Sequence, residues 1–177
     1  KNAAEFLITF GHTKIGFIRA PYRGNTNSAD RLRGVKDALR ESGIEARSEW
    51  CTDMVWNSIE PVDIDAFGAA VRSILLSSNP PTALVVDGAN IVAMVYGIAY
   101  TCGIRIPEQL SVVGFDDNKQ VCLQPPVTTF CQPLEQMVDT AKDYLHSVFS
   151  GKDVQNGNTY LPCTLIKRAS TASLSER

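Results

Sequence analysis

The sequence predicts an α/β protein in which a parallel sheet is covered by helices on both faces, giving three layers. Two observations indicate this class. Continuous apolar runs at 15–18, 83–86 and 110–114 have the length and composition of strands buried on both faces. Between them lie segments whose apolar residues recur at helical spacing. Strands that alternate with helices form right-handed βαβ units, and therefore a parallel sheet.

Up to residue 79, local signals place three helices and two strands. The first helix, 3–10, is stopped by Gly11. The second has an apolar stripe at Leu32, Val35 and Leu39 and is stopped by Gly43, a residue suited to the position after a helix. Asp63 caps the third, whose apolar face is Phe67, Ala70, Val71, Ile74 and Leu75. Strands are predicted at 15–18 and 46–51.

Asn79-Pro80-Pro81 breaks the chain, after which the alternation continues. Strand 83–86 ends at Asp87, and strand 110–114 ends at Phe115-Asp116. Helix 89–102 lies between them and is closed by Gly103. A further helix is predicted with Pro133 as its first residue and Gly151 as its stop. Extended stretches are predicted at 127–131 and 160–166.

Composition and charge exclude several classes of protein. The 177 residues carry 17 Lys and Arg against 19 Asp and Glu, a net charge of −2 that gives no electrostatic footprint for nucleic acid. The chain has no 18-residue apolar run that would span a membrane. Its start has neither an initiator Met nor a signal-peptide pattern, so we expect a piece of a longer chain.

The cysteines and histidines predict neither disulfides nor a metal site. Five cysteines without CxxC spacing do not form a disulfide or zinc framework and fit a reducing cytoplasm. His12 and His146 are too far apart in sequence to suggest a metal pair. We expect His12 to be a surface or helix-capping residue and His146 to face solvent. Trp50 and Trp56 either stack on a ligand or pack in the core.

Signatures of enzymes are missing from the sequence. Phosphate-binding loops, the dinucleotide-binding GxGxxG after a strand, HExxH and GxSxG do not occur. Asp116-Asp117 does not follow the first strand, where a receiver domain has its acidic pair. We therefore expect a binding protein that is not an enzyme and needs no cofactor.

Polar residues gather where the predicted strands end. In an open parallel sheet, ligands bind beyond the carboxyl ends of the strands. Strand 15–18 runs into the loop that holds Asn25 and Asn27, and the next two clear strands end at Asp87 and at Asp116. Amide, carboxylate and guanidinium groups are the hydrogen-bonding set that a polyhydroxylated or heterocyclic ligand requires.

Arg31 is a further candidate in this region. With Ser28 as the helix cap, Arg31 lies in the first turn, where a cation opposes the helix dipole at a cost of about 0.3–1 kcal/mol. A ligand or a carboxylate such as Asp116 would explain its presence. The alternative is a solvated Arg31 paired with the neighbouring Asp30.

Helix 89–102 has almost no polar face. A helix that covers one side of a sheet needs only an apolar stripe. The apolar residues beyond that stripe indicate a second partner, most simply another copy of the chain. The contact would be made through Ile91, Met94, Val95 and Ile98. The alternative is burial of the surplus under neighbouring helices.

Six segments, in order over nearly the whole chain, resemble the effector-binding domain of the lactose-repressor (LacI/GalR) family. The most specific of them is the block IPEQLSVVGFDD at 106–117. The six segments are 7–18, 30–39, 80–84, 106–117, 126–133 and 161–170. The resemblance implies a type I periplasmic-binding-protein-like fold, with two subdomains and ligand in the cleft between them. It also implies a homodimer in which helix 89–102 forms the contact.

The resemblance also implies how the chain is divided. Residues 1–131 and 163–171 would form the C-terminal subdomain, and 132–162 would belong to a mostly missing N-terminal subdomain. Residues 172–177 would be a tail, and the DNA-binding domain would lie outside this chain. The apolar stripe of the helix at 133–150 would then pack on the missing half. In its absence, we expect the stripe to be covered by a neighbouring copy or to fold back on its own domain.

The implied function is ligand sensing by a cytoplasmic bacterial transcriptional regulator, with a small effector, most simply a sugar. Arg31 and Asp116 stand at the family's ligand-contacting arginine and aspartate, and we expect them to pair in the empty site. Asn25 and Asn27 fall in a loop that contacts ligand in the family. Asp87-Gly88 departs from the usual Asn-Asp, which puts the ligand chemistry in question. The alternative is a periplasmic sugar-binding protein of a transporter.

Overall fold

A computed structural model of the chain describes residues 1–19, 26–52, 63–117, 122–152 and 157–174. Its centre is a five-stranded sheet with strands in sequence order. The first four strands are parallel, as predicted for the apolar runs. The fifth is antiparallel to the fourth, an orientation that was not predicted from the sequence. The strands are β1 (Ile15–Ile18), β2 (Ala83–Val86), β3 (Ser111–Phe115), β4 (Thr128–Cys131) and β5 (Thr164–Ile166).

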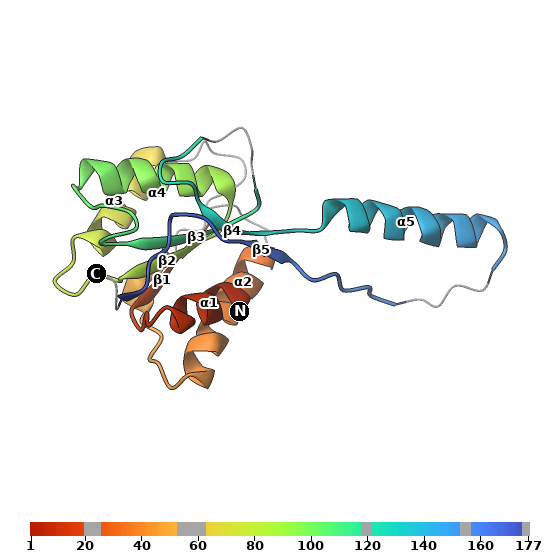
Figure 1. Cartoon of the computed structure of the whole chain (residues 1–177), viewed down its shortest axis with the longest axis horizontal. Coiled ribbons are helices and arrows are strands. Elements are labelled where there is room, and N and C mark those ends of the chain that lie inside the picture. The colour runs from red at the N-terminus through yellow and green to blue at the C-terminus, as the bar shows by residue number, and fades with distance from the viewer. Residues whose placement is uncertain (20–25, 53–62, 118–121, 153–156, 175–177) are drawn as a thin grey trace.

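Helices cover both faces of the sheet, which confirms the three-layer prediction (Figure 1). On one face lie α1 (Asn2–Thr9) and α2 (Thr26–Glu41), and on the other lie α3 (Ile64–Leu75) and α4 (Ala89–Thr101). Side chains of a strand alternate between faces. Accordingly Val113 belongs to the core under α1 and α2, whereas Val112 belongs to the core under α3 and α4.

The cap predicted for α3 is present. The Asp63 side chain accepts a hydrogen bond of 2.9 Å from the backbone N–H of Ala66, three residues into the helix. The predicted apolar face of this helix is buried at Phe67, Val71, Ile74 and Leu75.

Three local predictions were wrong. Residues 46–51 do not form a strand: Ser48–Trp50 is a short 3-10 helix, and only Cys51 bridges to β1, at Phe17. Trp50 is buried in the core and donates to the Asn79 carbonyl, which turns the chain inward before a strand can extend. Helix α2 starts at Thr26, so Ser28 lies inside it rather than capping it. Pro133 precedes α5 (Leu134–Phe149) rather than starting it.

His12 is buried, whereas the sequence predicted a surface or helix-capping residue. Its Nδ1 lies 2.9 Å from the Thr82 hydroxyl, and its Nε2 lies 3.1 Å from both the Ser111 hydroxyl and the Ala172 carbonyl oxygen. Because Thr82 and Ser111 border two strands and Ala172 follows β5, His12 ties the end of the chain to the sheet. A single histidine gives no periodic signal, so the sequence could not indicate this role.

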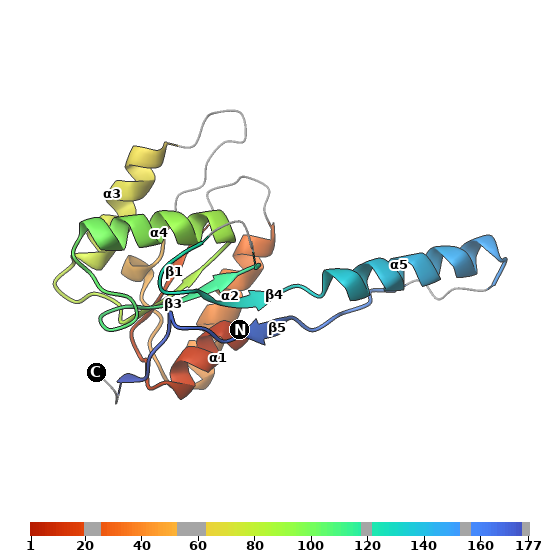
Figure 2. The ribbon, with the colours of Figure 1, turned by 45° about the horizontal axis from the view of Figure 1, so that its top comes forward.

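Helix α5 extends away from the sheet and buries none of its residues (Figures 1 and 2). Its apolar side chains, which include Leu134, Val138 and Leu145, are exposed in this single chain. The prediction that this stripe folds back on its own domain is therefore wrong. The chain enters α5 from β4 and returns through β5, so the helix is joined to the sheet by two adjacent antiparallel strands.

Over the residues described above, no helix combines the length and the apolar character needed to cross a membrane.

Candidate functional site

The candidate site lies at the edge of the sheet where the four parallel strands end. Pairing of neighbouring parallel strands brings the ends of β1, β2, β3 and β4 to one edge. Asp87 follows β2, Asp116 follows β3 and Gln132 follows β4. Helix α2, which carries Arg31, begins beside the same edge. The topology thus gathers polar side chains that are distant in sequence, as predicted for an open parallel sheet.

Arg31 forms an ion pair with Asp87. The Arg31 Nη1 donates to Asp87 Oδ1, and the Asp87 side chain is only 1% exposed, against 23% for Arg31. The expectation that Arg31 pairs with Asp116 was wrong, because Arg31 lies in the second turn of α2, opposite the end of β2. The neighbouring Asp30 pairs with Arg33 instead, at 2.8 Å.

Phe115 completes the surroundings of Arg31. The Cζ atom of the guanidinium lies 3.4 Å from the centroid of the Phe115 ring, a cation–π contact. Sequence reasoning missed Phe115 as a site residue because it was assigned only as the end of a strand. The signal was available: alternation along β3 puts Phe115 on the same face as Val113, under α2.

Asp87 has one oxygen without a partner. Asp87 Oδ2 is buried, and no donor among the described residues reaches it. A buried acceptor left unsatisfied costs about 1–3 kcal/mol, so such atoms are rare in folded proteins and need an explanation. Since Asp87 lines a cavity at the edge of the sheet, a ligand donor is a natural partner for Oδ2.

Asp116 is held at the same edge by its backbone and by Gln132. Its φ of 67° lies in the left-handed region, where Asp is tolerated better than most residues. The Asp116 N–H donates to the Phe130 carbonyl at 2.8 Å, and its own carbonyl accepts from the Thr129 hydroxyl at 3.0 Å. Gln132 Nε2 donates to Asp116 Oδ1 at 2.8 Å. Sequence reasoning missed Gln132, although it follows β4 as Asp116 follows β3.

Two cavities open on opposite faces of the sheet near this edge. The first, here called the α2-side cavity, has a volume of about 210 Å³ and is lined by Arg31, Asp87, Phe115 and Phe130 among others. The second, the α4-side cavity, has about 360 Å³ and is lined by Asp116, Cys122, Val92 and Val127 among others. Arg31 and Asp87 therefore share a cavity that does not include Asp116 among its lining residues.

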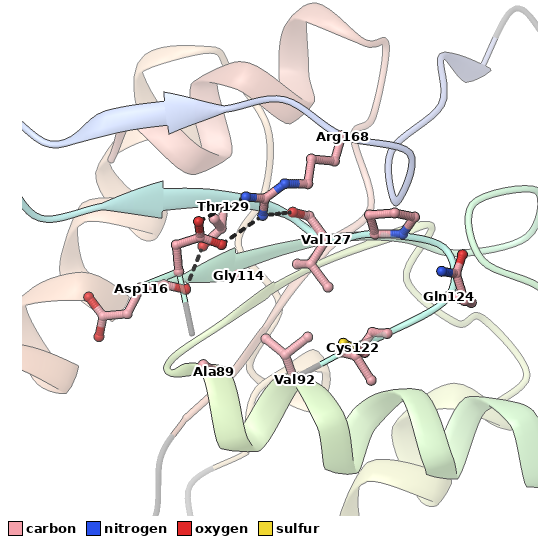
Figure 3. Close-up of a pocket in the computed structure, with 12 residues that line it drawn as sticks. Ala89, Val92, Gly114, Asp116, Cys122, Gln124, Val127, Thr129 and Arg168 are labelled. Atoms are coloured by element: carbon pink, nitrogen blue, oxygen red, sulfur yellow. Dashed lines mark hydrogen bonds and ion pairs between the residues drawn. The ribbon is translucent and has the colours of Figure 1, made fainter. Parts of the chain in front are cut away.

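The α4-side cavity is walled on one side by an ion pair (Figure 3). Nη1 and Nη2 of Arg168 each donate to the Asp117 carboxylate at 2.8 Å, and Nη1 also donates to the Val127 carbonyl at 2.9 Å. This hydrogen bonding to Asp117 raises the pKa of Arg168. Figure 3 shows the Asp116 carboxylate pointing away from Val92 and Cys122. Arg168 and Asp117 therefore satisfy each other's charge in the wall of this cavity.

The remaining predicted ligand residues are placed only in part. Asn27 is exposed in the first turn of α2. Asn25 and Trp56 lie outside the described residues. No cluster of His, Cys, Asp and Glu that could hold a metal ion occurs within the described ranges.

The four residues predicted to contact a second copy differ in burial. Ile91 and Val95 lie in the chain's own core, which removes them from any contact surface. Met94 and Ile98 are partly buried and pack against the edge of that core. Part of the apolar surplus of α4 is thus explained by the alternative, burial within the chain. On the same helix, Tyr100 is 85% exposed.

Comparison with known proteins identifies the family. Residues 4–171 match the periplasmic binding protein-like domain family. The ribose operon repressor of Haemophilus influenzae is 30% identical over 173 residues, which cover 97% of this chain and 50% of the repressor. The chain spans about half the length of the curated relatives it matches.

Solved structures agree with this assignment. A LacI-family regulator from Rhizobium etli has a TM-score of 0.83 and 25% identity, covering 97% of this chain and 61% of its own. A sugar-binding transcriptional regulator of the LacI family from Escherichia coli, complexed with phosphate, has a TM-score of 0.81 and 28% identity, covering 97% and 59%. The chain therefore belongs to the periplasmic binding protein-like domain family, and its homologues are transcriptional repressors of the LacI family.

Proposed function

We propose that this chain is the ligand-sensing part of a bacterial transcriptional repressor, and that its effector is a sugar. The observation that carries the proposal is the position of the Arg31–Asp87 ion pair and of Asp116 at the same carboxyl edge of the sheet. Guanidinium and carboxylate groups donate to and accept from hydroxyls, which are what a sugar offers. The names of the ribose operon repressor and of the sugar-binding regulator support this class of ligand.

The ligand would lie in a cleft between two subdomains, of which this chain supplies one. Residues 1–131 and 163–171 would form that subdomain, 132–162 would belong to the other, and 172–177 would be a tail. The extended position of α5 and its unburied apolar face support this division. DNA binding would come from a domain outside these residues, and the protein would act in the cytoplasm.

The sensor would work by shifting populations rather than by catalysis. A ligand that contacts both subdomains stabilises the closed arrangement, and it shifts the equilibrium only by its difference in affinity for the two states. The protein would release its effector unchanged and would need no cofactor. The relatives described above are repressors, which favours this function over transport by a periplasmic sugar-binding protein.

A homodimer is part of the proposal. The exposed surface of α4 around Met94, Ile98 and Tyr100 would form the contact between two copies. Coupling between copies would then allow ligand binding in the sensor to change the spacing of two DNA-binding domains.

Calorimetric titration of the full-length protein with D-ribose and a panel of other sugars tests the function. We expect one sugar to bind, and Arg31→Ala to weaken that binding at least tenfold, because a charge-assisted hydrogen bond contributes about 1.5–3 kcal/mol. Arg33→Ala is the matched control, since Arg33 is on the same helix with a side chain 72% exposed. Undiminished affinity in Arg31→Ala would remove Arg31 from the site.

A further inference from the structure

The two oxygens of Asp87 differ in a way that constrains the ligand. Oδ1 accepts from Arg31, whereas Oδ2 is buried and meets no donor from the described residues. Asp87 is one of the residues that line the α2-side cavity. An ionised carboxylate can only accept hydrogen bonds. The group that satisfies Oδ2 must therefore carry an O–H or N–H.

The two cationic side chains that line this cavity are already paired with carboxylates. The guanidinium of Arg31 is neutralised by Asp87 and lies against the Phe115 ring. The ammonium of Lys1, which also lines the cavity, is engaged by Glu5 and Glu41. The other lining side chains are mostly apolar, including Phe17, Val85 and Phe130. A phosphate placed beside Oδ2 would meet a like charge, and the two cationic side chains that line the described part of this cavity are already paired with carboxylates.

The geometry points to Asp87 as the residue that sets the charge class of the effector. Given the sensor function proposed above, the site accepts an uncharged ligand whose hydroxyl or amine donates to Asp87 Oδ2, and it rejects a phosphorylated ligand. The side-chain amide of an asparagine at this position would offer donors as well as an acceptor and would leave Arg31 with a net charge. Asp87 therefore acts as a specificity-determining residue.

The test compares D-ribose, D-ribose 5-phosphate and inorganic phosphate by calorimetric titration of the full-length protein. The variants are Asp87→Asn and, as a matched control, Asp30→Asn, whose side chain is 58% exposed on α2. Asp87→Asn keeps an oxygen for Arg31 and nearly the same volume, so we expect it to fold; a circular dichroism spectrum like that of the wild type and a single cooperative unfolding transition check this.

We expect the wild-type protein to bind D-ribose at least tenfold more tightly than its phosphate ester. Asp87→Asn should weaken ribose binding about tenfold, as expected for a lost charge-assisted hydrogen bond, and should gain measurable binding of phosphate or of the ester. Asp30→Asn should change neither. Equal or tighter wild-type binding of the phosphate ester would overturn the inference.

The titrations distinguish a wrong charge class from a wrong choice of effector. If neither sugar binds the wild-type protein, ribose is excluded as the effector, and inorganic phosphate alone decides the question of charge. Phosphate binding that appears in Asp87→Asn and is missing in wild type then supports the inference. Phosphate binding in wild type, or none in Asp87→Asn, overturns it.

Discussion

Arg31 in α2 and Asp87 at the end of β2 form an ion pair although they lie 56 positions apart in sequence. Asp87 is almost completely buried, and the guanidinium of Arg31 packs on Phe115. The pair fixes the position of α2 relative to the carboxyl edge of the sheet, so the same contact that shapes the site also stabilises the fold.

A double-mutant cycle measures this contact. We expect Arg31→Met and Asp87→Asn to be coupled by about 1–3 kcal/mol in the free energy of unfolding, because removing either partner leaves the other desolvated. The exposed pair Arg33 and Asp30 is the control, for which we expect less than about 1 kcal/mol. Urea denaturation of the four variants of each cycle gives both values. Equal coupling energies in the two cycles would mean that the buried Arg31–Asp87 pair contributes no more to stability than the exposed pair does.

His12→Ala should destabilise the protein by about 3 kcal/mol, since it opens a cavity and leaves buried polar groups unsatisfied. The groups at risk are Thr82, Ser111 and the Ala172 carbonyl. His146→Ala, at an exposed position on α5, should change stability by less than about 0.5 kcal/mol. Comparable losses from both substitutions, measured by urea denaturation, would contradict the role given to His12.

These residues show where sequence reasoning succeeded and where it stopped. Apolar periodicity and caps predicted the parallel sheet, the helices on both faces and the Asp63 cap, because those signals are local. The order of strands alone predicted that Asp87 and Asp116 lie at one edge of the sheet. The partner of Arg31 could not be predicted in this way, because it depends on where α2 begins. Helix α2 begins two residues before the predicted cap at Ser28.

Other features had no local signal at all. The burial of His12 depends on Thr82, Ser111 and Ala172, which meet only in the folded chain. The 3-10 turn at 48–50 depends on Trp50 reaching the Asn79 carbonyl. Long-range contacts of this kind override local propensity, so strand 46–51 was predicted where only Cys51 bridges to the sheet.

Tyr96 should titrate far above an ordinary tyrosine. Burial raises the pKa of Tyr96 to about 12, and its hydroxyl donates to the Pro125 carbonyl at 3.0 Å. The folded state thus holds this proton more tightly than the unfolded chain, whose tyrosine pKa is about 10. Protonated Tyr96 therefore contributes stability that is fully present below the tyrosine pKa of the unfolded chain. This stability is lost as the pH rises toward 12.

The measurement is an ultraviolet absorbance titration of wild type minus Tyr96→Phe. The difference should show a single tyrosinate step close to pH 12. A step at the ordinary tyrosine pKa would show that Tyr96 is open to solvent.

The exposed stripe of α5 should be buried in the full-length protein. There, Leu145→Asn should lower the free energy of unfolding by about 2 kcal/mol or more, because a large apolar side chain would leave its partners. Asp143→Asn, on the same helix, should cost less than about 0.5 kcal/mol. Thermal and urea unfolding of both variants compare the two positions. A Leu145→Asn protein as stable as the control would mean that the stripe has no intramolecular partner.

The dimer contact is tested on α4. Ile98→Lys should convert the full-length protein from dimer to monomer in sedimentation velocity, because a charge would be placed inside an apolar contact. Thr101→Lys, which is exposed on the same helix, is the control. A dimer that survives Ile98→Lys at the same dissociation constant would place the interface elsewhere.

The most direct test of the sensor assignment is a crystal structure of the full-length protein with the sugar that titration identifies. We expect density for the sugar at the carboxyl edge of the sheet, with a hydroxyl donating to Asp87 Oδ2 and with Arg31 and Asp116 in contact with the sugar. Density in the α4-side cavity, among Val92, Cys122 and Val127, with Asp87 Oδ2 still unpartnered, would contradict it.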